Sequence, residues 1–242
     1  MKTCCLFIGL ILFSGTSLVA SYKEALKLFE KKEYRTSLNM IADELVIADD
    51  FKPESPNYEL RLLAAHNHWK LGSTSSAISH FTRCIEIKKA DIAAYIDLSL
   101  LQLELKKYAD ADNTARRGLQ IQKSSMLYYI LGVSSMRRGN YWRAKEMLEK
   151  ANSIDPDLYY SYNALGITLM KLKKYSEANT AFSAANAIKP KSAEIINNLG
   201  MSYEKLGKNK EAYEWYQKAA SLSTQNSTVA ANLERVRAKL DN

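Results

Sequence analysis

The sequence contains few residues that interrupt regular structure. Its 242 residues include only 4 Pro and 9 Gly, and they contain no low-complexity tract. This composition argues against long disordered segments. Hydrophobic side chains make up 47% of the chain, which is ordinary for a folded protein.

The sequence also lacks a recognisable catalytic or metal-binding constellation. Its three histidines are His66, His68 and His80. His66 and His68 are two residues apart on a predicted helix, so they point to nearly opposite sides and cannot share a metal ion. Gly-rich phosphate-binding and dinucleotide-binding patterns are absent, and no nucleophile stands beside a base. We therefore expect no enzyme activity, no cofactor and no metal.

The first twenty residues have the layout of a secretory signal peptide. Lys2 precedes an uncharged apolar stretch over residues 6–13, and small and polar residues follow as far as Ala20 and Ser21. The apolar stretch is too short for a comfortable transmembrane helix. We expect cleavage after Ala20 or Ser21, and an uncleaved N-terminal anchor is the alternative.

Cysteine usage fits an exported chain without disulfides. Cys4 and Cys5 precede the apolar stretch, whereas bacterial lipoproteins carry the modified Cys after it, so we do not expect lipid attachment. Removal of the signal would leave only Cys84, and a single cysteine cannot form an intramolecular disulfide. We interpret Cys84 as a small buried thiol rather than a catalytic one.

Three segments match one another at a spacing of 34 residues. Each carries Leu-Gly near its start, an Ala twelve residues after that Gly, an aromatic residue or Leu four later, and another Ala three after that. A period in this range indicates a stacked array of helix pairs. With the Gly numbered 8, the matched positions are 8 (Gly132, Gly166, Gly200), 20 (Ala144, Ala178, Ala212), 24 (Leu148, Phe182, Tyr216) and 27 (Ala151, Ala185, Ala219).

The pattern resembles the tetratricopeptide repeat, or TPR, a helix-turn-helix unit of 34 residues. The resemblance implies an all-α, right-handed superhelical solenoid of about six repeats with a C-terminal capping helix. We expect a signal peptide or anchor over 1–20, a repeat array over 21–226 and the cap over 227–242. The approximate repeats are 21–51, 58–91, 92–124, 125–158, 159–192 and 193–226.

The register predicts two structural roles for glycine. At position 8 the two helices of a repeat cross closely, and a side chain would hold them apart. At position 15, just after the first helix, a left-handed residue ends that helix. Gly72, Gly139 and Gly207 occupy position 15.

The resemblance implies that the first helices line a concave groove, mainly through positions 2, 5, 9, 12 and 13. Those positions are apolar and Met-rich over most of the chain and become polar toward its C-terminal end. Soluble proteins rarely expose a continuous apolar surface without a use for it. We interpret the surface as a groove for an apolar peptide or helix, and packing between adjacent helices is the alternative. The candidate groove residues are Trp69, Leu103, Tyr129, Val133, Met136, Arg137, Asn163, Ile167, Met170, Lys171, Asn197 and Met201.

Within the groove we expect two kinds of contact. Apolar side chains would anchor the ligand, and two asparagines would hydrogen-bond its backbone. TPRs that bind chaperone tails instead use Lys at position 5 and Asn at position 9, and the three best-matched repeats lack that pair. The expected anchors are Trp69, Tyr129, Met136 and Met170, and the asparagines are Asn163 and Asn197.

The net charge of +8 is partly concentrated at the turns between the two helices of a repeat. A stripe of this kind could face an anionic membrane surface or an acidic protein, and solvated turns are the alternative. Nucleic acid is not expected because the chain has the features of an exported protein. Trp142 and Trp215 either cover a seam between repeats or mark a second contact surface. The basic turn residues are Lys106, Lys107, Arg137, Arg138, Lys173, Lys174, Lys208 and Lys210.

These features predict a non-enzymatic adaptor that mediates protein–protein interactions in the cell envelope. We expect it in the periplasm or on the extracytoplasmic side of a membrane. Its size and repeats resemble bacterial envelope assembly factors such as type IV pilus pilotins, although pilotins are usually lipoproteins. Two alternatives stay open: a ligand-binding subunit that carries a small hydrophobic molecule or lipid, and a structural protein that assembles with copies of itself.

Overall fold

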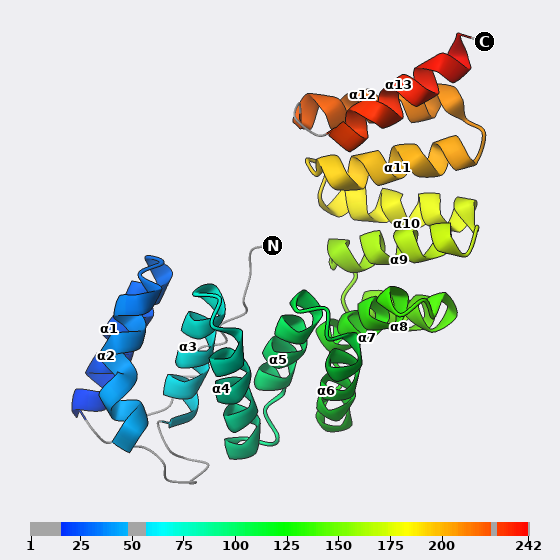
Figure 1. The fold of residues 1–242 in the computed structure, drawn as a ribbon. Helices are drawn as coiled ribbons and strands as arrows, with labels where there is room; N and C mark the ends of the chain where they lie inside the picture. The colour runs from blue at the N-terminus through cyan, green and yellow to red at the C-terminus, as the bar shows by residue number, and fades with distance from the viewer. Residues whose placement is uncertain (1–15, 48–56, 224–226, 242) are drawn as a thin grey trace. The chain divides into compact units, whose positions relative to one another are not determined.

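A computed structural model of the chain describes residues 16–47, 57–223 and 227–241, and all regular structure in these ranges is helical (Figure 1). The helices are α1 (Thr16–Glu30), α2 (Tyr34–Ile47), α3 (Asn57–Lys70), α4 (Thr74–Ile87), α5 (Ile92–Glu104), α6 (Tyr108–Ile121), α7 (Ser125–Arg137), α8 (Tyr141–Ile154), α9 (Tyr159–Lys171), α10 (Tyr175–Ile188), α11 (Ala193–Lys205), α12 (Asn209–Leu222) and α13 (Ser227–Leu240).

The chain divides into two compact units, which we describe separately. Unit 1 spans residues 1–122 and contains α1 to α6, and unit 2 spans residues 123–242 and contains α7 to α13. In both units consecutive helices pack as pairs, and the second helix of a pair also packs on the first helix of the next. The expected all-α solenoid of six helix pairs is confirmed.

The two helices of each pair are joined by the same turn. Gly72, Gly139 and Gly207 have positive φ angles of 76°, 81° and 76°, as position 15 predicts. After α7, the N–H of Asn140 donates to the carbonyl of Ser135 at 2.9 Å, which closes the helix end around the left-handed residue. The other three pairs use lysine at this position, Lys32, Lys106 and Lys173, with φ of 67°, 60° and 59°.

In each pair of unit 2, the two helices pack closely where the first helix carries glycine at position 8. A Cβ placed on Gly166 would lie 2.5 Å from Phe182 Cε1, and one on Gly132 would lie 2.5 Å from Leu148 Cγ. Gly200 meets the ring of Tyr216 in the same way, at 2.8 Å. The absent side chain therefore makes room for the large residue at position 24, as the register predicts.

Cys84 occupies the small-residue position 27 of the second pair. Its side chain is fully buried, and its thiol donates to the carbonyl oxygen of Tyr58 at 3.7 Å. Burial raises the pKa of the Cys84 thiol well above its usual value, so the thiolate is scarce at neutral pH. The expectation of a buried thiol is confirmed.

First helices form the inner layer of unit 2. α9 contacts both α7 and α11, and α11 also contacts α13, whereas no contact of this strength joins one second helix to the next among the described helices. In a curved stack of helix pairs, the layer whose successive helices touch has the shorter radius. The first helices therefore lie on the inner side, where the groove is expected.

The capping helix α13 closes the last pair with apolar and charged contacts. Val229 and Val236 are 1% and 0% exposed. Glu204, at the end of α11, accepts from Arg235 at 2.6 Å, from Lys239 at 2.7 Å and from the hydroxyl of Tyr216 at 2.9 Å. The bonds from Arg235, Lys239 and Tyr216 hold the pKa of Glu204 at about 2, in that order of effect, against the opposing effect of burial. Glu204 is therefore a charged anchor for the cap.

The expected signal peptide lies mostly outside the described residues. α1 begins at Thr16, so residues 16–20 of that segment are part of a helix that continues into the first pair. Among the residues that the structure describes, none of the helices has both the length and the apolar character needed to cross a bilayer.

Replacement of Gly166 by Ala tests the helix crossing. Ala is the better helix former by about 1 kcal/mol, but its Cβ would overlap the buried Phe182 ring, and overpacking typically costs about 1–3 kcal/mol. Because the Cβ would lie only 2.5 Å from the ring, the overpacking cost should fall in the upper part of this range. We therefore expect a net loss of about 1–2 kcal/mol in the free energy of unfolding, measured by urea denaturation. In a Phe182→Ala background the ring is gone, and the same change should be neutral or stabilising; equal losses in both backgrounds would contradict this account.

A second test uses the pH dependence of the cap. Because the pKa of Glu204 falls from 4.5 to about 2 on folding, its stabilising effect is complete above pH 4.5 and is lost as pH falls toward 2. Glu204→Gln should lower the free energy of unfolding at pH 7 by about 1–2 kcal/mol, since both cations are half-exposed and screened. Urea denaturation should show a smaller difference between variant and wild type at pH 3.

The control for that test is Glu234→Gln, an exposed carboxylate on α13. It should change stability by less than about 0.5 kcal/mol at either pH. An equal effect of the two substitutions would show that Glu204 does not hold the cap.

Candidate functional site

Four of the predicted groove residues come together on the inner layer of unit 2. Tyr129 and Val133 lie on α7, and Ile167 and Met170 lie on α9, the next inner helix. All four are partly buried and pack against a core that includes Leu148, Leu165, Leu169, Phe182 and Leu199. We call these four side chains the inner column. Each is held by the core on one side and keeps accessible surface on the other.

The remaining predicted groove residues of unit 2 differ in exposure. Met136 is 8% exposed and Asn197 is 7% exposed, so neither presents much surface to a ligand. Met201 is partly buried against the cluster around Tyr216 and Val236. Arg137, at the end of α7, and Lys171, at the end of α9, are both exposed.

Trp69 and Leu103 belong to unit 1, where both are partly buried. The indole N–H of Trp69 donates to Glu104 Oε2 at 3.0 Å. Its ring stacks on His66 at 6.3 Å between centroids and meets Phe81 edge-on at 6.0 Å. Trp69 is therefore fixed between α3, α4 and α5.

The two asparagines expected to bind a peptide backbone have partners within the chain. Asn163 donates to Glu194 Oε1 at 3.0 Å and accepts from Asn198 Nδ2 at 2.9 Å. Asn197 accepts from Asn232 Nδ2 at 2.9 Å. These bonds link α9 to α11 and α11 to α13, so the asparagines form a ladder along the inner layer.

Sequence analysis missed this ladder, although a signal for it exists. Asn163 and Asn198 are 35 residues apart, and so are Asn197 and Asn232. In a 34-residue repeat these pairs place position 5 of one first helix opposite position 6 of the next. A search for polar pairs one residue beyond the repeat length would have found them.

Tyrosines extend the inner column at its α7–α9 contact. The ring of Tyr129 meets Tyr160 edge-on at 4.7 Å, and Tyr160 meets Tyr159 at 5.3 Å. The pKa of Tyr129 is raised to about 12, and burial is the largest of the effects that raise it. Its hydroxyl therefore stays protonated at physiological pH. The column therefore offers an apolar surface with a neutral hydroxyl group.

Trp142 and Trp215, for which the sequence allowed either a seam between repeats or a second contact surface, differ in exposure. Trp215 is partly buried in the core clusters of unit 2 and stacks on Tyr203 at 6.4 Å, so it covers a seam. Trp142 is 64% exposed at the start of α8. Only Trp142 is therefore presented as a surface residue.

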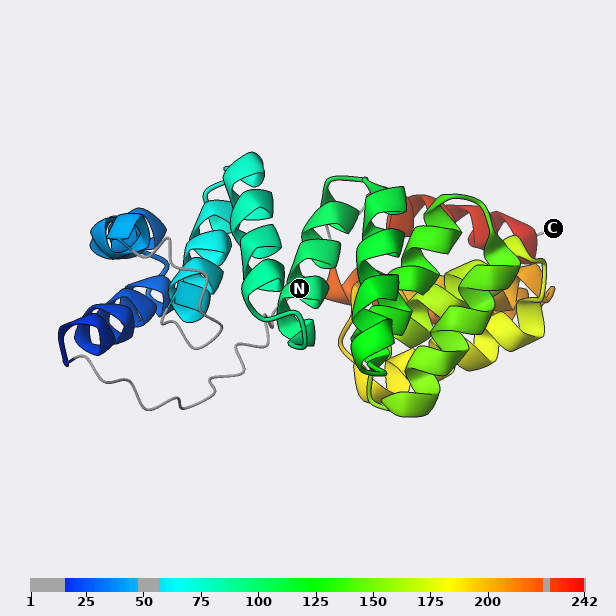
Figure 2. The same ribbon diagram turned by 90° about the horizontal axis from the view of Figure 1, so that it is seen from below.

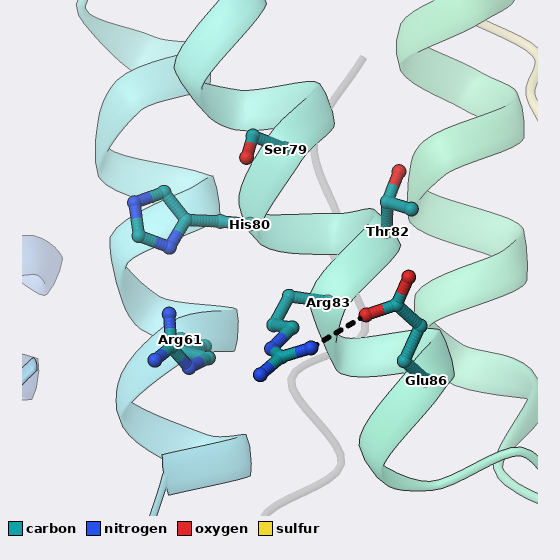
Figure 3. A pocket seen from close by; sticks show the side chains of 6 residues that line it. All are labelled: Arg61, Ser79, His80, Thr82, Arg83 and Glu86. Atoms are coloured by element: carbon teal, nitrogen blue, oxygen red, sulfur yellow. Dashed lines mark hydrogen bonds and ion pairs between the residues drawn. The ribbon is translucent and has the colours of Figure 1, made fainter. Parts of the chain in front are cut away.

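Unit 1 has a polar pocket of about 380 Å³ between α3 and α4 (Figure 3). Within it Arg83 pairs with Glu86 at 2.9 Å. Burial, with His68 and Arg61 nearby, lowers the pKa of His80 to about 4, so this histidine is neutral at pH 7. The lining residues are Arg61, Ser79, His80, Thr82, Arg83 and Glu86.

The chemistry of this pocket does not match an apolar ligand. Charged and hydroxyl side chains line it, and a hydrophobic molecule would have to desolvate them. In residues 16–47, 57–223 and 227–241, no group of three or more metal-ligating side chains is present. The inner column is thus the better candidate for binding an apolar partner.

Solved structures show the same fold at low sequence identity. PilW, a type IV pilus biogenesis factor, is 17% identical with a TM-score of 0.76, covering 92% of this chain and 99% of PilW. MamA from Desulfovibrio magneticus RS-1 is 19% identical with a TM-score of 0.63, covering 72% of this chain and 99% of that one. YrrB is described as a TPR protein with an unusual peptide-binding site. It is 18% identical with a TM-score of 0.59, and the match covers 73% of this chain and 91% of YrrB.

TPR proteins bind protein or peptide partners and are generally non-enzymatic scaffolds. No curated protein sequence matches the chain closely enough to count as a relative. A family model matches residues 18–242, which is nearly the whole chain, and its description is the C-terminal domain of cilia and flagella-associated protein 70. The chain therefore belongs to this family of TPR proteins.

Proposed function

We propose that the protein is a scaffold that binds an apolar peptide or an amphipathic helix along the inner column of unit 2. One observation carries this proposal. Tyr129, Val133, Ile167 and Met170 are packed against the core but not enclosed by it. A partner that covers them would bury apolar surface without any rearrangement of the core.

The energetics fit a partner of modest size. Full burial of an apolar side chain is worth about 1.5–3 kcal/mol, and these four residues are already half-buried. The entropy lost when a flexible peptide associates and becomes ordered offsets much of this favourable free energy. Affinity in the micromolar range is the natural result, as in many scaffold interactions.

Polar groups at the ends of the column favour a particular partner. Arg137 and Lys171 are exposed at the ends of the two helices that carry the column. An amphipathic helix with acidic residues beside its apolar stripe would place its charges next to these cations. The structural neighbour YrrB has a peptide-binding site, and we extend peptide binding to this chain as part of the proposal.

The asparagine ladder modifies the role expected for Asn163 and Asn197. Asn197 is nearly buried and bonded to Asn232, and we assign it to holding the last first helix against the cap. Asn163 is less buried, and its amide donates to the exposed Glu194. We assign Asn163 as the residue that exchanges an internal partner for the backbone of a bound peptide.

Two other functions remain competitors with distinct readouts. A carrier of a small hydrophobic molecule or lipid would show an added small mass in native mass spectrometry. A self-assembling structural protein would appear as an oligomer in the same spectrum. The peptide scaffold that we propose predicts an unmodified monomer that gains mass only when peptide is added.

We also propose that the protein is exported and acts in the cell envelope. The apolar segment after Lys2 and the small residues before Ala20 support export. PilW, described as a pilus biogenesis factor, has a similar fold over nearly its full length. A periplasmic or membrane-associated location follows from this part of the proposal.

Met170→Glu tests the inner column. A panel of apolar helical peptides, selected from a displayed random library, should bind wild type and lose at least about tenfold in affinity for the variant, because a buried charge replaces an apolar contact. Fluorescence anisotropy measures the affinity. Thr180→Glu, at an exposed site on α10, is the matched control and should bind as wild type. Peptides that bind Met170→Glu and wild type equally would contradict the proposal.

Export is tested by the N-terminus of the protein recovered from its native cells. We expect the chain to start after Ala20 or Ser21, as determined by N-terminal sequencing. Lys2→Glu should slow processing because it removes the positive charge before the apolar segment. A mature chain that retains Met1 and stays in the cytosol would refute export without affecting peptide binding.

A further inference from the structure

The within-pair turns of unit 2 and the end of α13 lie along one edge. Figure 1 shows the α9–α10 turn, the α11–α12 turn and the C-terminal end of α13 on the same side, and Figure 2 agrees. The bonds from Arg235 and Lys239 to Glu204 place the end of α13 beside the end of α11. Lys174, before α10, lies 5.5 Å from the Trp142 ring at the start of α8. We call this surface the turn edge.

The turn edge carries an excess of exposed positive charge. Its acidic side chains include Glu177, which pairs with Lys174, and Glu204, which is 8% exposed and held by the cap. Glu211 and Asp241 also lie near it. The exposed cations of the turn edge are Arg138, Lys173, Lys205, Lys208, Lys210, Arg237 and Lys239.

Large apolar side chains are exposed among these cations. Trp142 is 64% exposed, Leu206 in the α11–α12 turn is 37% exposed, and Leu240 at the end of α13 is 38% exposed. They come from three separate elements and share one edge. Exposed tryptophan at this level is uncommon in a soluble protein, and here core packing does not require it.

We propose that the turn edge binds the surface of an anionic lipid bilayer. The cations face phosphate headgroups, and Trp142, Leu206 and Leu240 enter the boundary between headgroups and acyl chains. Tryptophan favours that boundary because its ring is apolar while its N–H remains polar. Basic residues attract anionic lipid without needing a fixed hydrogen-bond geometry.

The arrangement fits a bilayer better than an acidic protein. An acidic protein partner would be recognised by paired, oriented charges around a packed hot spot. The turn edge instead spreads its cations over three turns and one helix end, with single apolar residues between them. A fluid surface of negative headgroups matches that spread.

Membrane docking goes beyond peptide binding and uses a different surface. The inner column lies along α7 and α9, whereas the turn edge is made from the ends of the helices. The two sites therefore allow simultaneous occupation. A scaffold that docks on a membrane by this edge would hold its peptide partner close to the lipid surface.

Vesicle sedimentation with the full chain tests this inference. We expect binding to vesicles of phosphatidylcholine with about 30% phosphatidylglycerol, little binding to pure phosphatidylcholine, and a steep loss of binding as salt is raised. Arg138→Glu, Lys208→Glu and Lys210→Glu together should reduce partitioning at least about tenfold. Trp142→Ala should reduce it several-fold and abolish quenching of tryptophan fluorescence by brominated lipids.

The matched control is Lys150→Glu, Lys191→Glu and Lys218→Glu together, three exposed cations of unit 2 that lie outside the within-pair turns. It changes net charge equally and should bind the anionic vesicles much more tightly than the turn-edge triple variant. Equal loss in both triple variants, or equal binding to both kinds of vesicle, would overturn the proposal. A third outcome would also overturn it: the chain binds polyglutamate more tightly than vesicles, and Trp142→Ala has no effect on binding. That result would indicate an acidic protein partner.

Circular dichroism of each variant confirms that it is folded before its binding is compared. Met170→Glu should bind vesicles as wild type does. Failure of the membrane proposal is thus separable from failure of peptide binding.

Discussion

Close contact between a glycine and a large side chain across each helix pair of unit 2 is the constraint on which the rest of this unit depends. Gly166 lets α9 approach α10 until Phe182 fills the space that a Cβ would take. Gly132 and Gly200 do the same opposite Leu148 and Tyr216. Because the pairs cross in the same way, the same positions of successive first helices are brought next to one another, and side chains at these positions form rows.

Two rows with different chemistry follow from that repetition. The asparagine ladder and the Glu204 cluster join successive first helices through hydrogen bonds and ion pairs, and they fix the register of the inner layer. The inner column uses neighbouring positions on the same helices but remains partly open. Polar groups thus align the inner layer, while apolar groups are left for a partner. The helix ends carry the cations and Trp142, so the two candidate surfaces are formed by different residues.

The sequence was sufficient to predict the fold because the repeated residues are those that close helix packing requires. Gly at position 8 and Ala at positions 20 and 27 are required by close packing, so their recurrence at 34 residues specifies the helix pairs directly. The left-handed turn at Gly139 was predictable for a different reason, because glycine adopts a positive φ without the steric penalty of a side chain. The equivalent turn at Lys173 was not, since lysine does not favour a positive φ and only the surrounding helices impose it.

The candidate site was harder to predict because it depends on how exposed each side chain is and on which hydrogen-bond partner it has. Met136 and Met170 occupy the same repeat position, yet Met136 is 8% exposed and Met170 is more open. Position alone cannot distinguish them, since exposure depends on neighbours in adjacent pairs. Asn163 and Asn197 were expected to be available to a ligand, and their partners become evident only when position 6 of the next helix is placed opposite them.

The division of the chain into two units bears on how the groove should be tested. Trp69 and Leu103 were predicted to share one groove with Met170, but they belong to unit 1, and the column is established here within unit 2 alone. The most direct measurement is photo-crosslinking of an apolar helical peptide to the full chain with a photoreactive residue at position 170 or, separately, at position 180. Our account predicts peptide adducts from position 170 and none from position 180. Equal adducts at both positions, or adducts only at position 180, would contradict it.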